Sequence, residues 1–466
     1  MLFHTWTFAL FFAVVYPVYL LVKNTRLRVP WLLAASYVFY GWWNWRFLVL
    51  ILVSTTVDYL AVVAMSRSRR RAPWLAVSVV TNLGLLGFFK YGDFFVQSVN
   101  AALAWVGVRY GLASPAVLMP EGLPYLLPVG ISFFVFQSMS YTIDFYRGKI
   151  GREPSFLRYA AFVSLFPQLV AGPIERAGHL LPQLHGAPRI TGRDAADGLS
   201  LFLVGLFKKV ALADYLALYV DRVYGAPADY QGPALALATF AFGWQIYFDF
   251  SGYTDMARGI GRMLGLRLML NFNAPYLATG LGDFWNRWHI SLSTWFRDYV
   301  YIPLGGNRGG AGRTYLNMAL TMLISGLWHG ASWTFVAWGA LHALGRVATR
   351  RLERTPFYRD RVPTFVKRLW VFLFVTLAWV FFRAASFSDA WLILGRIFSF
   401  AVADPAMPLL ALGMVLAVWL YQGLHESRVR SVLASAPVRI GLAVMMALTV
   451  ALFAAAGGQA FIYFQF

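Results

Sequence analysis

Two of the seven histidines stand in sequence surroundings that could support acid–base chemistry. The first, His329, lies in the stretch LISGLWHGASW, which has apolar segments on both sides, so we expect it at membrane depth. An ionisable group there is costly to bury and is therefore a functional candidate. The alternative is a hydrogen-bonded histidine between packed helices, which the small neighbours Gly326, Gly330 and Ala331 would permit. Position alone does not decide between the two interpretations.

The second histidine, His289, lies in the stretch FWNRWHISLS. Taken as one helix, this stretch predicts an apolar stripe of tryptophans beside a polar row that contains Asn286, His289, Ser293 and Arg297. Such a helix suits the membrane interface, where its tryptophans would sit at the level of the lipid head groups. Periodicity alone therefore favours an interfacial helix over a catalytic one.

A third polar stretch, WQIYFDFSGYTD, brings carboxylates and hydroxyls to the end of a predicted span. It contains Asp249, Ser251 and Tyr253. A helix cap with an interfacial anchor is the slightly favoured interpretation. The functional alternative is the polar lining of a tunnel.

Several other chemistries are excluded by motifs that the sequence lacks. It has no phosphate loop of the form G-x-x-x-x-G-K-[ST], no G-x-S-x-G nucleophile elbow and no H-E-x-x-H zinc helix. It has no cysteine, which excludes disulfides, thiolate metal sites and a cysteine nucleophile. We expect no metal site, because histidines and carboxylates do not cluster. The glycine-rich loop at 305–310 is expected to be a flexible interfacial turn.

The composition defines the class of protein in which these residues act. Hydrophobic residues make up 59% of the 466 residues and charged residues 13%, whereas a soluble domain carries about 25% charged residues. Soluble, disordered and collagen-like classes are therefore excluded. Long apolar runs indicate helices rather than a barrel, so the sequence predicts an all-α polytopic membrane protein.

The formal net charge of +20 has two interpretations. A nucleic-acid surface is one, but the basic residues cluster in short loops between apolar runs, which is typical of cytoplasmic loops. We therefore expect no nucleic-acid partner and place the loops at 23–30, 66–73 and 147–155 in the cytoplasm. The first apolar run has no basic residues before it and no cleavage site after it, which predicts an uncleaved span with its N-terminus outside.

The apolar pattern predicts one integral membrane domain, 1–466, with eleven to thirteen membrane segments of about 20 residues per full span. Residues 156–172 are broken by prolines and are expected to be re-entrant or interfacial, and 255–303 form a long amphipathic stretch. The apolar segments from which the membrane segments are drawn, two of them shorter (31–43 and 47–65), are 3–22, 31–43, 47–65, 74–90, 93–108, 125–146, 199–220, 233–254, 314–328, 331–345, 365–383, 388–401, 408–422 and 437–464.

Four motifs together resemble the membrane-bound O-acyltransferase family, over nearly the whole chain. In chain order they are PQLVAGPIE, WQIYFDFSGYTDMARG, FWNRWHISLSTWFRDYVYIPLGGNR and GLWHGASWTFVAWG. The essential histidine of the family matches His329, and its second histidine matches His289. Because of this resemblance, we interpret both histidines as functional residues and not as structural ones.

The resemblance implies a ring of transmembrane helices around a thin centre, where funnels from both membrane faces nearly meet. It implies an inner-membrane enzyme that acetylates an exopolysaccharide such as alginate, with no permanently bound cofactor and with cytoplasmic acetyl-CoA as the donor. The acceptor is the polymer itself or a periplasmic acetyltransferase or relay protein of a secretion complex. His329 would be the general base and His289 would orient a substrate. Asn286 and the Trp328 indole N–H could bind the thioester oxygen, with Asp249, Ser251 and Tyr253 in substrate binding.

Three alternatives remain at this stage. The same fold could transfer D-alanine or another acyl group to a cell-envelope polymer. A transporter of acetate, lipid or glycan would do no chemistry, but no inverted repeat supports that class. A non-catalytic scaffold of a secretion complex is disfavoured by the intact histidine pair.

Overall fold

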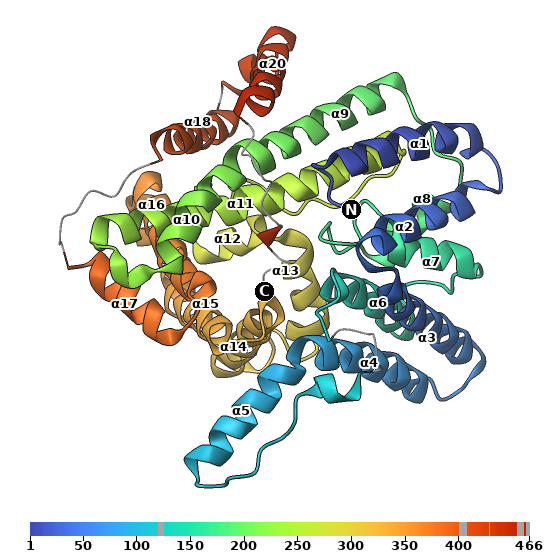
Figure 1. Ribbon diagram of the computed structural model, residues 1–466, viewed down its shortest axis with the longest axis horizontal. Helices are drawn as coiled ribbons and strands as arrows, with labels where there is room; N and C mark the ends of the chain where they lie inside the picture. The colour runs from blue at the N-terminus through green and yellow to red at the C-terminus, as the bar shows by residue number, and fades with distance from the viewer. Residues whose placement is uncertain (120–124, 400–407, 428, 454–460, 463–466) are drawn as a thin grey trace. The chain divides into compact units, whose positions relative to one another are not determined.

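Helices form the regular secondary structure of the residues that the structure describes, which are 1–119, 125–399, 408–427, 429–453, 461 and 462. The structure is a computed structural model (Figure 1). It confirms the predicted all-α class. The chain divides into two compact units that are each discontinuous in sequence. The expectation of one integral domain stays a prediction.

The first unit consists of Met1–Leu199 and Ala257–Met269. Its helices are α1 (Trp6–Val22), α2 (Arg28–Asn44), α3 (Leu48–Arg67), α4 (Ala72–Leu86), α5 (Gly92–Trp105), α6 (Ile131–Tyr146), α7 (Phe156–Ser164) and α8 (Ala177–His185). It also holds the beginning of α9 (Gly192–Leu206) and the end of α11 (Gly232–Met263).

The second unit consists of Ser200–Met256 and Leu270–Phe466. Besides the remaining parts of α9 and α11 it contains α10 (Asp214–Gly225), α12 (Leu281–Arg287), α13 (Ile290–Phe296), α14 (Gly310–His329), α15 (Trp333–Leu352), α16 (Thr364–Arg383), α17 (Phe387–Ile397), α18 (Leu409–His425), α19 (Arg430–Leu433) and α20 (Ala436–Phe453). Single π-helical segments, among them η4 (Phe207–Ala213) and η7 (Arg297–Tyr301), extend α9 and α13.

Within the described residues, three helical stretches are long and apolar enough to cross a membrane. They are Arg28–Arg67, Ala72–Trp105 and Thr364–Arg383. The helices Trp6–Val22, Leu409–His425 and Ala436–Leu452 are apolar but shorter. Large apolar side chains on these helices, such as Leu10 and Val80, are 70% exposed in the protein alone, which suits a surface that faces lipid tails.

Two details of the predicted span pattern are informative. The segments expected at 74–90 and 93–108 are not separate: the π-helical segment η2 (Gly87–Tyr91) joins α4 to α5, and Gly92 keeps helical dihedral angles (φ −58°, ψ −53°). The stretch at 156–172 is indeed no ordinary span, because α7 ends at Ser164 and the chain continues in buried turns. Whether this stretch is re-entrant or interfacial stays a prediction.

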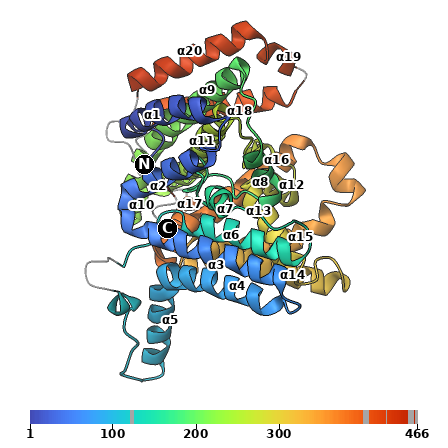
Figure 2. The same cartoon turned by 90° about the vertical axis from the view of Figure 1, so that its right-hand side faces the viewer.

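A buried polar network ties three helices of the first unit together. Asp58 lies in the middle of α3 and is fully buried. Asn82 of α4 donates to both of its carboxylate oxygens at 2.9 Å, and the Ser138 hydroxyl of α6 donates to Oδ2. Ser54 donates in turn to Asn82 Oδ1 at 2.7 Å. The carboxylate is thus satisfied by its neighbours, and α3, α4 and α6 lie side by side (Figures 1 and 2).

The helices α14 and α15 form a hairpin whose backbones nearly touch. A Cβ atom on Gly326 would lie 2.3 Å from the Phe335 carbonyl oxygen and 3.2 Å from Gly339 Cα. Small residues at such a crossing let two helices approach closely. The hairpin also positions His329, a predicted site residue, which is the last residue of α14.

The G326A variant is therefore expected to lose about 1–3 kcal/mol of stability, since the added methyl group must push α15 away. The matched control lies on the same helix: a Cβ atom on Gly312 would meet no atom within 4 Å. G312A should be neutral or gain about 0.5–1 kcal/mol, because alanine is the better helix former. Thermal unfolding of the two purified variants in detergent measures the difference. Equal melting temperatures would show that the close approach does not constrain residue 326.

Candidate active site

His329 is fixed at the point where α14 ends. Its imidazole is buried, and the chain leaves the helix at Gly330, which is extended (φ −158°, ψ 148°). A Cβ atom on Gly330 would lie 2.1 Å from a ring carbon of Phe335, so only glycine leaves room for that ring. The sequence GLWHG therefore ends the helix and holds the histidine in place.

His289 is held in a backbone conformation that side chains rarely adopt. It lies between α12 and α13 with φ 42° and ψ 56°, in the left-handed region. The continuous amphipathic helix predicted from the sequence is wrong at this point. In a continuous helix the Ile290 N–H would donate to residue 286, but it donates instead to the Asn271 carbonyl oxygen at 2.9 Å. Strained conformations of this kind cluster at functional sites.

The structure brings the two histidines together within the second unit. Their ring centroids are 6.4 Å apart, and both side chains are buried. The indole of Trp328 contacts both of them, with centroid distances of 5.9 Å to His289 and 5.0 Å to His329. Three of the predicted site residues thus form one cluster. The roles assigned to them stay predictions.

Aromatic side chains from three other helices complete this cluster. Trp338 of α15 and Phe382 of α16 lie 5.1 and 5.3 Å from the His329 ring. Phe250 of α11 lies 4.6 Å from the His289 ring, edge to face. These three residues are not predicted from the sequence. Their helical periodicity gives no signal, because a tryptophan that lines a site and one that faces lipid look alike in a membrane helix.

A further buried histidine, His342, lies on α15 in contact with Trp338 of this cluster. Its ring lies 4.7 Å from Trp338 and 5.1 Å from Trp285. Neither ring nitrogen has a hydrogen-bond partner among the described residues. His342 is not predicted from the sequence, although its spacing of one helical turn from Trp338 places both on the same face.

The other predicted residues are held by contacts of different kinds. Asp249 is buried in an ion triad: Lys209 Nζ lies 2.9 Å from Asp249 Oδ1 and 2.9 Å from Asp214 Oδ1. Asp249 Oδ2 also accepts a hydrogen bond from the Ile462 N–H at 2.7 Å. The triad therefore connects η4, α10 and α11 with the segment at 461–462.

Tyr253 and Ser251 are likewise buried on α11. The Tyr253 ring packs against Phe461 at 4.9 Å, so it contacts the same late segment as Asp249. Asn286, in contrast, is exposed on α12 and lies outside the buried cluster. The substrate-binding roles of these residues and of Asn286 stay predictions.

Two variants of His289 distinguish the effect of its left-handed backbone on stability from the effect of its imidazole on activity. H289A and H289G both remove the imidazole, so both should lose activity to the same extent. Glycine adopts this conformation freely, whereas a Cβ atom costs about 1–2 kcal/mol there. We therefore expect H289G to unfold at a higher temperature than H289A. Parallel melting curves and transfer assays test this, and an H289A protein as stable as H289G would show that the backbone relaxes.

Comparisons with known proteins show what this chain is similar to. The sequence model of the membrane-bound O-acyltransferase family matches residues 125–394, which include both histidines. The probable alginate O-acetylase of Azotobacter vinelandii is 44% identical over 386 residues, which cover 81% of this chain and 74% of that protein. The peptidoglycan O-acetyltransferase of Helicobacter pylori is 37% identical over 79% of this chain and 73% of its own length. The teichoic acid D-alanyltransferase of Streptococcus thermophilus is 29% identical over 47% of this chain and 56% of its own length.

Proposed function

Because this chain belongs to the membrane-bound O-acyltransferase family, we propose that it transfers acetyl groups to the hydroxyls of a cell-envelope polysaccharide such as alginate. The names of its relatives all describe the transfer of an acyl group to an envelope polymer. Acetyl is favoured over D-alanine, because the two acetylating relatives match about four fifths of the chain at higher identity. The observation that carries the proposal is the buried pair of His289 and His329.

The proposed reaction needs a base, since a sugar hydroxyl is a poor nucleophile near neutral pH. The neutral imidazole of His329 takes the hydroxyl proton while the hydroxyl oxygen attacks the carbonyl carbon of an acetyl thioester. The C–S bond then breaks, and the imidazolium returns its proton to the departing thiolate. The products are an O-acetyl ester and a free thiol, and the imidazole is neutral again.

The attack leaves negative charge on the thioester oxygen, which hydrogen-bond donors must stabilise. The indole N–H groups of Trp328 and Trp338 support this role, because both rings contact His329. The Trp338 Nε1 atom is buried and has no hydrogen-bond partner among the described residues. Trp338 is thus a donor candidate that is not predicted from the sequence. Asn286 is a weaker candidate because it is exposed.

The donor and the partners are part of the proposal. Acetyl-CoA supplies an activated acetyl thioester, the kind of donor that the proposed attack requires. We place its entry on the cytoplasmic side of the inner membrane, next to the basic loops. The acceptor is then on the other side, either the polysaccharide or a periplasmic relay protein that passes acetyl to it.

Acetyl esters on the polymer test this function directly. The envelope polysaccharide is purified from a deletion strain and from the same strain complemented with this chain, and its ester-linked acetate and D-alanine are counted. We expect acetate to disappear in the deletion strain and to return on complementation. Loss of D-alanine esters instead would favour the alternative acyl group, and unchanged esters of both kinds would overturn the proposal.

Direct transfer predicts that no serine of this chain carries the acetyl group. Ser325 is buried one turn before His329 on α14, whereas the Ser332 hydroxyl caps α15 by accepting from the Thr334 N–H at 3.3 Å. S325A and S332A should each cost far less than loss of His329. Purified protein is incubated with radiolabelled acetyl donor, without acceptor, and then denatured. Label retained on wild type but absent from one of these variants would demonstrate an acyl-enzyme.

A further inference from the structure

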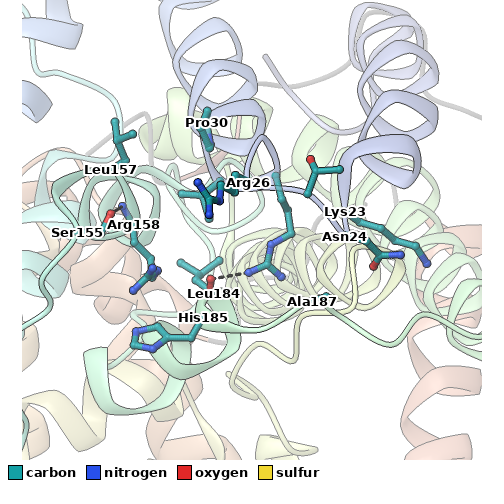
Figure 3. Close-up of a pocket in the computed structure, with 13 residues that line it drawn as sticks. Lys23, Asn24, Arg26, Pro30, Ser155, Leu157, Arg158, Leu184, His185 and Ala187 are labelled. Atoms are coloured by element: carbon teal, nitrogen blue, oxygen red, sulfur yellow. Dashed lines mark hydrogen bonds between the residues drawn. The ribbon is translucent and has the colours of Figure 1, made fainter.

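A basic pocket of about 390 Å³ is lined by residues of the first unit (Figure 3). It is formed where the loop between α1 and α2 meets the start of α7 and the end of α8. Figure 3 shows Arg26, Arg158 and His185 around it, each from a different segment. The pocket thus brings together side chains that are far apart in the sequence.

The lining carries an excess of positive charge. It includes Lys23, Arg26, Arg28 and Arg158 and contains no carboxylate. The nearest acid to which these residues bond is the buried Glu153, and both of its carboxylate oxygens are already engaged. Oε1 lies 2.7 Å from Arg158 Nη1, and Oε2 lies 2.7 Å from His185 Nε2. The four cationic side chains and the histidine of the lining therefore outnumber the one carboxylate that pairs with Arg158 and His185.

The buried position of Arg28 shows that the pocket is part of the packed structure and not only a cluster of surface charges. The residue is only 4% exposed, and its Nη2 atom donates to the Leu184 carbonyl oxygen. The Arg28 guanidinium also hydrogen-bonds to the Tyr19 hydroxyl of α1, so two other segments hold it in place. The guanidinium groups of Arg26 and Arg158 line the same pocket, and guanidinium groups match phosphate oxygens in geometry.

The surroundings of the pocket indicate where the anion comes from. Lys23 directly follows the apolar helix α1, and the side chains of Leu21, Leu27 and Leu157 around the basic loop are 81%, 62% and 47% exposed. Exposed leucines beside clustered cations are typical of the membrane interface, where acyl chains and head groups meet. We propose that this pocket binds the phosphate of an anionic phospholipid, with the acyl chains against the neighbouring apolar surface.

Lipid titration of the full-length protein tests the proposal. The purified chain in neutral detergent is titrated with phosphatidylglycerol, phosphatidylcholine or inorganic phosphate, and bound lipid is counted by native mass spectrometry. The variant K23Q/R26Q removes two cations from the pocket, and R69Q/R70Q removes two from another basic loop of the same unit, where both side chains are exposed. Both variants have the same net charge, so they differ only in where the charge is lost.

We expect one saturable phosphatidylglycerol site that is weakened at least about tenfold in K23Q/R26Q, the effect of losing one charge-assisted hydrogen bond. R69Q/R70Q should bind like wild type. If both double variants bound the lipid equally weakly, net charge alone would explain the effect, and the proposal of a specific site would be wrong. Inorganic phosphate that binds as tightly as phosphatidylglycerol would overturn the assignment to a lipid. Equal affinity for phosphatidylcholine would overturn the requirement for an anion.

Discussion

Replacing His329 with glutamine is expected to lower acetyl transfer by about 10²- to 10⁴-fold, the usual contribution of a general base. Glutamine keeps a polar group of similar reach at the end of α14 but cannot accept and return a proton. The variant should therefore still be inserted in the membrane and melt near the wild-type temperature. Initial rates of acetyl transfer by equal amounts of purified protein measure the loss.

The matched control for this variant is H425Q, which makes the same substitution at an exposed histidine on α18. It should transfer acetyl at the wild-type rate. If H329Q retained more than a tenth of wild-type activity, another group would have to accept the proton. The neighbouring His289, 6.4 Å away between ring centroids, would be the first to examine, through the double variant H289Q/H329Q.

Replacing Lys209 with methionine is expected to destabilise the protein by about 3–5 kcal/mol, because it leaves two buried carboxylates without their common cation. Asp214 and Asp249 are 2–4% exposed in their side chains, so water cannot take the place of the lysine. The Asp249 carboxylate also accepts from the Ile462 N–H. The loss should therefore loosen the contacts of the segment at 461–462 as well. Unfolding in mixed detergent and SDS micelles gives the free-energy difference.

The adjacent residue provides the control. Lys208 also pairs with one aspartate, Asp255, at 2.7 Å, but these side chains are 16% and 14% exposed. The K208M variant should lose clearly less stability than K209M, since water reaches the aspartate that remains. If the two variants unfolded at the same SDS fraction, the buried triad would contribute no more than the ordinary pair.

The parts of the fold that the sequence predicts well are those set by local pattern. The expected segments 31–43, 47–65, 314–328 and 331–345 each overlap one helix, namely α2, α3, α14 and α15, although α14 begins earlier, at Gly310, and α15 continues to Leu352. Local pattern also predicts that His329 belongs to a buried region, since apolar residues surround it on both sides. The separation of 74–90 from 93–108 fails because a glycine between two apolar runs can remain helical, as Gly92 does.

The parts that the sequence does not predict depend on distant partners. The break at His289 arises because Asn271 takes the N–H of Ile290, and no periodicity in 284–299 contains that information. The same break explains why Asn286 and His289, expected on one polar face, differ so much in exposure. Trp338 and Phe382 join the cluster through packing between α14, α15 and α16, which a single sequence does not show.

The buried Asp58 network has a consequence for how the chain enters the membrane during synthesis. A lone aspartate at the centre of a span adds about 2.5–3.5 kcal/mol to the cost of releasing that span into lipid. Its partners Asn82 and Ser138 are made only later, on α4 and α6. Because of this free-energy cost, we expect α3 to stay at the insertion machinery until α6 has been synthesised. The three helices would then pass into the bilayer as a preassembled group instead of one by one.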